Sequence, residues 1–190
     1  MKALLRPAVT LFAALTVLTG VVYPLAVTGV SQLLFPQEAN GSIVKVNGKA
    51  VGSALIGQQF SSPGYFWGRP SATGPQAYNA AASSGSNLGP LNPALSDAVK
   101  ARIEGLKAAD PGNEQPVPVD LVTASGSGLD TEISLAAAYY QAPRIARIRN
   151  IPLGQVKTLI EQHADHPWLG IFGEPKVNVL ALNLALDAQH

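Results

Sequence analysis

The stretch TASGSGLDTEIS, residues 123–134, holds the residues best placed for chemistry, because Ser125 and Ser127 lie among glycines there. A serine in this setting acts as a nucleophile, helps to bind a phosphate, or belongs to a plain turn. The nucleophile turn of many hydrolases reads G-x-S-x-G, whereas here the glycines adjoin Ser127 directly. Three histidines follow as candidate bases, but the residues around them do not indicate a catalytic triad: His163, His166 and His190. A serine hydrolase that uses Ser127 stays open as an alternative.

Phosphate binding is poorly supported in the same stretch. Asp130 and Glu132 would repel an anion at the start of the helix expected after them. The segment GSALIGQQ at 52–59 has the glycine spacing of a P-loop, but Gln58 stands where the phosphate-binding lysine is needed. We therefore expect a turn in which Ser125, Ser127 and Asp130 accept hydrogen bonds from backbone amides.

A metal site is weakly indicated. His163, Asp165 and His166 would bring two imidazoles together, but they also fit a helix that ends before Pro167. The chain contains no cysteine, which excludes thiolate ligands and cysteine nucleophiles. We expect no catalytic residue, no metal and no firmly bound cofactor.

An aromatic segment, FSSPGYFWGRP at 60–70, has the composition of a core element or of a docking surface. Most such clusters add apolar mass to a core. Exposed Trp, Tyr and Arg are enriched at interfaces, which makes Phe66, Trp67 and Arg69 candidate contact residues.

A basic segment, PRIARIRN at 143–150, allows two interpretations. Its arginines would form an anion site with Gln141, or they would lie on a solvated helix face and pair with nearby acids. Arg144 and Arg147 are further candidates for partner contact.

The N-terminal part predicts a membrane span. No charged residue lies between Arg6 and Glu38, and this stretch exceeds the roughly 20 residues that cross a bilayer as a helix. Lys2 and Arg6 place the N-terminus in the cytoplasm, because short basic flanks are retained there. We expect a cytoplasmic segment at 1–6, a transmembrane helix at 7–35 and an extracytoplasmic domain at 36–190. A cleaved signal peptide is the alternative, although its apolar core would be shorter.

The outer part predicts mixed helices and strands. Asn47-Gly48 indicates a β-hairpin at 42–57, and the uncharged segment 71–91 reads as a long loop. Asn92 and Pro93 begin a helix that ends before Pro111, with a buried stripe made of Leu95, Val99, Ile103 and Leu106. A buried strand at 117–124, helices near 134–141 and 153–163, and a strand turning into a helix at 176–187 complete one α/β domain, with α+β as the other possibility.

Overall composition limits the partners. Hydrophobic residues make up 47% of the 190 residues and charged residues only 13%, which fits a membrane protein better than a soluble one. The formal net charge is +1, and this near-neutral balance argues against nucleic acid as a partner.

Five segments together resemble one known family. They read GSALIGQQF at 52–60, YFWGRPSATG at 65–74, SSGSNLGPLNPAL at 83–95, PVDLVTASGSGLD at 118–130 and VNVLALNLALD at 177–187. In this order, behind a single span, they resemble the C subunit of the potassium-transporting P-type ATPase, the KdpC family. The chain departs from the family at Thr131 and Glu132, where proline and histidine are common, and at Asn150, where glycine is common.

The resemblance implies a non-catalytic accessory subunit of the bacterial KdpFABC complex in the inner membrane. Its partners would be the channel-like KdpA, the ATP-hydrolysing KdpB and the small KdpF, with potassium as the transported ion. The family is described as a catalytic chaperone that raises the ATP affinity of KdpB. In that description Ser125, Gly126, Ser127, Gly128 and Gln141 would sense nucleotide, which conflicts with a domain outside the cytoplasm. A free-standing extracytoplasmic binding module is the other alternative.

Overall fold

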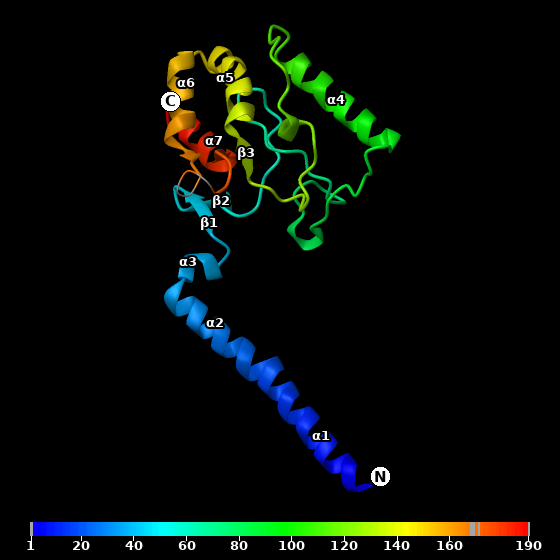
Figure 1. Ribbon diagram of the computed structural model, residues 1–190. Coiled ribbons are helices and arrows are strands. Elements are labelled where there is room, and N and C mark those ends of the chain that lie inside the picture. Colours follow the sequence, from blue (N-terminus) through cyan, green and yellow to red (C-terminus); the bar gives the residue numbers. More distant parts are fainter. Residues whose placement is uncertain (1, 168–169, 171, 190) are drawn as a thin grey trace. The chain divides into compact units, whose positions relative to one another are not determined.

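A computed structural model describes residues 2–167, 170 and 172–189 (Figure 1). The chain divides into two compact units, Met1–Val51 and Gly52–His190, and each is described by itself. The candidate base His190 lies outside the described residues.

The first unit begins with one long helix. It consists of α1 (Lys2–Val17), a π-helical turn η1 (Leu18–Val22) and α2 (Tyr23–Leu34). The helical stretch Ala3–Leu34 contains an 18-residue window with a mean hydropathy of 1.9 and is long and apolar enough to cross a membrane, close to the predicted span at 7–35. In the π turn the amide of Tyr23 donates to the carbonyl of Leu18, which shifts the ladder by one residue just before Pro24. Such a turn accommodates a proline ring that would otherwise meet the carbonyl four residues earlier.

The predicted hairpin is confirmed. After the short helix α3 (Pro36–Ala39), β1 (Ile43–Val46) pairs with β2 (Lys49–Ser53). Asn47 and Gly48 connect the strands with φ values of 51° and 78°. Both values are positive, as a two-residue hairpin turn of the favoured twist requires.

The second unit contains a three-stranded sheet of order β3-β5-β4 and three helices packed with it. The strands are β3 (Glu132–Ser134), β4 (Ala164–Asp165) and β5 (Lys176–Asn178), and both pairs are antiparallel, with Ile133 opposite Val177. The helices are α5 (Leu135–Arg149), α6 (Leu153–Gln162) and α7 (Val179–Asp187). The mixed class of the prediction is confirmed, and the antiparallel pairing is the arrangement of an α+β domain.

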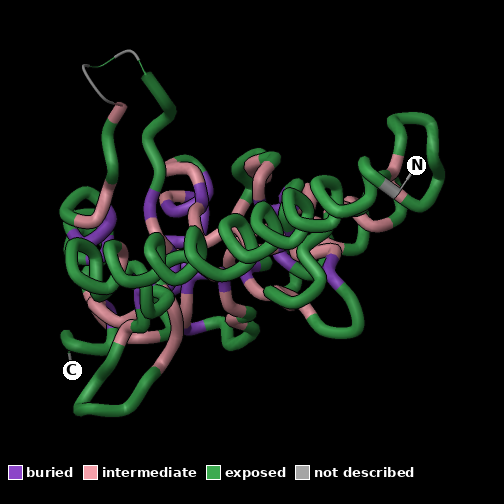
Figure 2. The backbone as a smooth tube through the Cα atoms, turned by 90° about the horizontal axis from the view of Figure 1, so that it is seen from below, coloured by how far each residue is buried: buried purple, intermediate pink, exposed green. Residues whose placement is uncertain are grey.

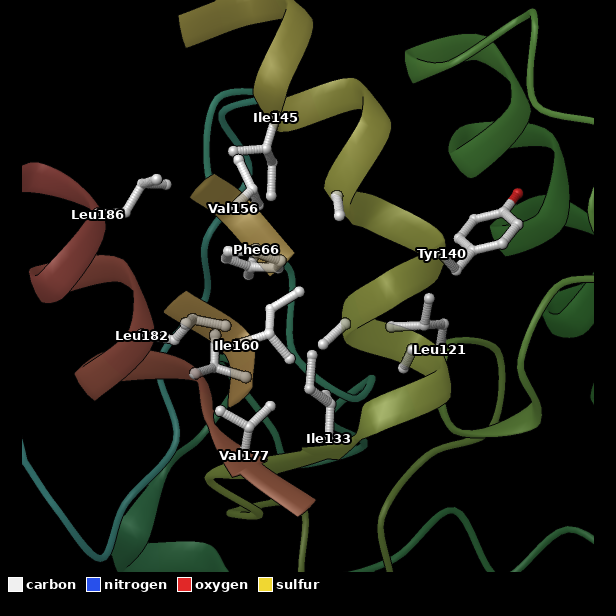
Figure 3. Close-up of a cluster of buried hydrophobic side chains, with 14 of the residues drawn as sticks. Phe66, Leu121, Ile133, Tyr140, Ile145, Val156, Ile160, Val177, Leu182 and Leu186 are labelled. Atoms are coloured by element: carbon white, nitrogen blue, oxygen red, sulfur yellow. The ribbon is translucent and has the colours of Figure 1, made fainter. Parts of the chain in front are cut away.

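The hydrophobic core lies among α5, α6, α7 and the sheet. Ile145, Ile160 and Leu182 are fully buried and point toward one another from the three helices, with Phe66 between them (Figure 3). Buried positions concentrate in these elements, whereas the long N-terminal helix is exposed at residues 3–30 (Figure 2). The prediction that the aromatic segment adds mass to the core is confirmed for Phe66.

The helix α4 (Pro93–Ala109) begins as predicted, because the side chain of Asn92 accepts from the amide of Ala94 at 3.0 Å. Its predicted buried stripe is only partly buried. Leu106 is buried, and Val99 and Ile103 pack on the core while half-exposed. Leu95 is also half-exposed.

The strand expected at 117–124 is wrong. Residues Val119–Leu121 form a 3-10 turn, η3, in which the carbonyl of Val119 accepts from the amide of Thr123 at 2.9 Å. Val119 is 71% exposed, so this segment does not have the burial on both faces that a central strand needs. The carboxylate of Asp120 accepts from the amide of Ser134 at 2.8 Å, which fixes the turn against β3.

The helix predicted near 134–141 begins at the right place but continues to Arg149. Ser134 caps it by accepting from the amide of Ala137 at 3.0 Å. Pro143 lies inside α5 without ending it, because Ala142 and Ile145 beside it are fully buried and hold the helix in the core. Asn150 ends the helix with φ 54°, a left-handed conformation that glycine or asparagine adopts at this position.

Candidate functional site

The turn at 123–130 binds the long loop at 71–91. The carbonyl of Ser127 accepts from the amide of Ser84 at 3.0 Å and from the hydroxyl of Ser83 at 2.9 Å. The carbonyl of Gly128 accepts from the hydroxyl of Ser71 at 2.7 Å. The turn therefore orders a loop that has only one short helix of its own, η2 (Ala80–Ala82).

Gly128 is the residue that this close approach requires. Its φ is +68°, and a Cβ atom there would lie 2.5 Å from Cγ2 of Thr73 and 2.7 Å from the carbonyl oxygen of Ser84. At Gly126, by contrast, a Cβ atom would meet nothing within 4 Å. The two glycines of the motif therefore differ, because only Gly128 is needed for packing.

The predicted hydrogen bonds of the turn are confirmed for two of three side chains. Ser127 Oγ accepts from the amide of Leu129 at 3.1 Å, and Asp130 Oδ1 accepts from the amide of Glu132 at 3.3 Å. The prediction is wrong for Ser125, whose hydroxyl is buried without a partner among the described residues. Asp130 also pairs with Arg69 at 3.0 Å, an interaction between segments far apart in sequence.

The geometry of the described residues gives no support to a hydrolase or a metal site. Neither Ser125 nor Ser127 bonds to a described histidine, and a serine nucleophile needs a base within hydrogen-bond reach. His163 Nδ1 lies 3.0 Å from the carbonyl oxygen of Leu159, at the end of α6. Within residues 2–167, 170 and 172–189, no three His, Asp or Glu side chains gather as metal ligands.

Gln141, the predicted partner of the serine-glycine turn in nucleotide binding, is 1% exposed. Its Oε1 accepts from the amide of Trp67 at 2.8 Å and from Arg144 at 2.8 Å. Its Nε2 donates to the carbonyls of Trp67 and Ala137. The amide is thus fully occupied in joining the aromatic segment to α5.

Arg144 is buried rather than solvated. Its guanidinium donates to the carbonyls of Pro63 and Tyr65, at 3.1 Å to the latter, and lies 4.5 Å from the ring centre of Trp67. Burial lowers the pKa of Arg144 to about 10, which still leaves it charged at neutral pH. Both predictions for the basic segment, an anion site and a solvated helix face, are wrong for Arg144. Its guanidinium donates to backbone carbonyl oxygens and lies over the ring of Trp67.

The other two arginines of α5, Arg147 and Arg149, form ion pairs with acidic residues of the same domain. Arg147 pairs with the buried Asp110 at 2.8 Å, so the expected pairing with an acid is confirmed there. Arg149 pairs with Asp187 at 2.8 Å and lies over the ring of Tyr65. Of the predicted contact residues, Phe66 is 0% exposed and Arg144 only 2%, so neither belongs to the surface of this domain.

A cleft of about 400 Å³ lies between α4 and the segments 59–71 and 77–78. Its walls combine aromatic and aliphatic side chains with two arginines, and the main contributors are Phe60, Trp67, Arg69, Tyr78, Arg102 and Leu106. Burial raises the pKa of the Tyr78 hydroxyl, which donates to the carbonyl of Arg69 at 2.5 Å. The volume falls within the range of clefts that bind small ligands or side chains.

Sequence reasoning found Trp67 and Arg69 but missed the α4 wall of this cleft. Arg102, Gly105 and Leu106 are three and four residues apart and share one helix face. The local indication of this wall in the sequence was that Arg102 and Gly105 share a helix face with the core residue Leu106. Nothing local predicts Tyr78, which enters the cleft from the long loop.

Comparison with known proteins agrees with the five matching segments. The family model described as "KdpC: K+-transporting ATPase, c chain" matches residues 5–188. The potassium-transporting ATPase KdpC subunit of Polaromonas naphthalenivorans is 67% identical over 188 residues, which cover 99% of this chain and 96% of that protein. The subunit of the same name from Herminiimonas arsenicoxydans is 65% identical over the whole of both chains, and that of Herpetosiphon aurantiacus is 60% identical over 98% of this chain and 97% of that protein.

The candidate membrane-spanning helix and the unit of mixed helices and strands fit the class of single-pass membrane proteins. The chain belongs to the KdpC family, the c chains of the K+-transporting ATPase.

Proposed function

We propose that this chain is a non-catalytic accessory subunit that stabilises the ATP-driven potassium uptake complex KdpFABC in the bacterial inner membrane. The observation that carries the proposal is the match of the KdpC family model to nearly the whole chain. Its relatives at 60–67% identity bear the name of a potassium-transporting ATPase subunit. KdpA, KdpB and KdpF would be its partners.

The long helix supports assembly within a membrane complex. None of its most apolar window is buried by the rest of this chain, so lipid and partner helices would cover it. Gly20 and Gly29 leave open space beside the helix, where a Cβ atom would meet nothing within 4 Å. Small residues of this kind allow other helices to approach closely.

We also propose that the N-terminus is cytoplasmic and the domain after residue 36 is periplasmic. The basic residues before the span, Lys2 and Arg6, support this orientation, because short basic flanks are retained in the cytoplasm. Because the chain has no cysteine, a single cysteine at the exposed Ser84 would report the side of the membrane. We expect a membrane-impermeant thiol reagent to label the Ser84→Cys chain in intact spheroplasts, and protection until lysis would contradict this orientation.

A role in raising the ATP affinity of KdpB would require nucleotide at residues 125–128 and Gln141. The amide of Gln141 is already occupied by four internal hydrogen bonds, so we place the stabilising role first. Absence of labelled-ATP binding to the full-length chain, beside binding by KdpB, would agree with this order.

Deletion of the chain tests the proposed function. We expect the remaining subunits to purify as an incomplete complex without potassium-stimulated ATPase activity, and re-expression of the chain to restore both. An unaffected complex would contradict the proposal.

A further inference from the structure

The cleft beside α4 is cationic. Among the described residues that line it, Arg69 and Arg102 are the charged ones, and no acid faces them from the lining. Asp130, which is not among the lining residues, pairs with Arg69 at 3.0 Å and neutralises one of the two charges. Burial lowers the pKa of Arg102, as expected for a cation that has lost solvent without gaining a carboxylate partner.

Both arginines keep hydrogen-bond donors that the domain does not use. Arg69 uses Nη1 on Asp130, and its Nε has no partner among the described residues but is buried below the surface of the cleft. Arg102 donates from Nη1 to the carbonyl of Val122 at 3.0 Å and makes no other hydrogen bond within the described part of the chain. A guanidinium has five N–H groups in a fork that matches a carboxylate.

Gly105 and Tyr78 shape two walls of the cleft. Gly105 faces it from α4 without a side chain, and a Cβ atom there would meet nothing within 4 Å. Tyr78 holds the opposite wall with φ 56°, a conformation that is costly for a bulky residue and that hydrogen bonds to Arg69 and Ser71 maintain.

We propose that this cleft receives an acidic side chain from an extracytoplasmic loop of a partner subunit, with the carboxylate bound by Arg102 on the wall opposite Tyr78. The aromatic rings of Phe60 and Trp67 cover the apolar part of the inserted residue. The inference rests on the proposed function, because it assigns the docking surface of the accessory subunit. Charge complementarity selects the occupant, because Arg102 has no carboxylate partner among the described residues and therefore favours an anionic group.

Substitutions at two positions of α4, both outside the hydrophobic core, test the cleft. Gly105→Leu fills it and replaces glycine by a better helix former, while Gly105→Ala is the matched control that leaves most of the space free. Arg102→Gln removes the charge and Arg102→Lys restores it, with Lys107→Gln as the control for loss of an exposed charge on the same helix. The unfolding midpoint of each purified full-length chain establishes that the domain is folded.

We expect Gly105→Leu and Arg102→Gln to raise the rate at which the chain dissociates from the detergent-purified complex about tenfold, as loss of a bound charge pair does. Gly105→Ala and Lys107→Gln should change that rate less than about twofold, and Arg102→Lys should recover part of the loss. Unchanged dissociation in folded Gly105→Leu and Arg102→Gln chains would overturn the cleft, while the deletion experiment would still uphold the subunit role.

Cross-linking identifies the occupant. A photoreactive maleimide on Gly105→Cys, in a chain that has no other cysteine, should join a peptide of a partner subunit that contains Asp or Glu. Cross-links to lipid alone, or to a peptide without an acid, would overturn the proposal.

Discussion

The arginines of α5 and those of the cleft differ in what their charges meet. On α5, Arg144 directs its donors at backbone carbonyls, and Arg149 bonds to the carbonyl of Gly64 and to Asp187. In the cleft, Arg102 uses one donor, on the carbonyl of Val122, and Arg69 pairs with Asp130. Arg144 and Arg149 thus meet several acceptors of their own chain, whereas Arg102 meets one carbonyl and no carboxylate among the described residues, which leaves its charge available for a partner.

The largest effect is expected at Arg144. Arg144→Met keeps the apolar length but removes the donor to the carbonyls of Pro63 and Tyr65 and one of the two donors to Oε1 of Gln141. We expect the free energy of unfolding of the full-length chain in detergent, measured with denaturant, to fall by about 3 kcal/mol. Lys107→Met, an exposed control, should change it by less than about 0.5 kcal/mol. Equal effects of the two substitutions would contradict the buried role of Arg144.

The next effect concerns the serine-glycine turn, which presses against the long loop. Gly128→Ala forces a Cβ atom toward Thr73 and the carbonyl of Ser84 at a positive φ, so we expect a loss of about 2 kcal/mol and faster proteolysis of residues 71–91. Gly126→Ala, the matched control, meets nothing and should leave both measurements unchanged. If the two alanines behave alike, the turn does not order the loop.

A smaller effect is expected at the start of α5, the helix that contains Arg144 and Arg149. Ser134→Ala removes the hydroxyl that accepts from the amide of Ala137, which costs about 1 kcal/mol in typical helix caps. Ser134→Asp retains an acceptor and should recover most of this stability. Denaturant unfolding measures both, and the absence of any difference between them would argue against the cap.

The smallest effect is expected from the exposed pair of Lys176 and Glu132, 2.6 Å apart across β5 and β3. The hydrogen bond to Glu132 raises the pKa of Lys176 above its ordinary value of 10.5, so its contribution is complete below that pH and disappears as pH rises through the folded-state pKa. Lys176→Met should therefore cost about 0.5 kcal/mol at pH 8 and progressively less above pH 10.5, measured by denaturant unfolding at each pH. A difference that grows with pH would contradict the pairing.

Elements that depend on a few neighbouring residues were predicted correctly from those residues. Asn47-Gly48 and Asn92-Pro93 set their turn and helix start by the conformations of two residues each, and both predictions are confirmed. The strand at 117–124 failed because Asp120 binds the amide of Ser134, an interaction that apolar pattern does not encode.

The candidate site was predicted only in part, because its decisive contacts are long-range. Arg144 and its acceptors at 63 and 65 are separated by about eighty residues, and burial there came from packing rather than from sequence pattern. Trp67 and Arg69 were found by residue type, whereas Tyr78 reaches the cleft only through the folded loop.

Purification of the tagged full-length chain from detergent-solubilised membranes tests the central claim most directly. Our account predicts that potassium-stimulated ATPase activity elutes with the chain in constant proportion to it. Elution of the folded chain alone, with all such activity in the unbound fraction, would contradict its role as a subunit and favour a free-standing binding module.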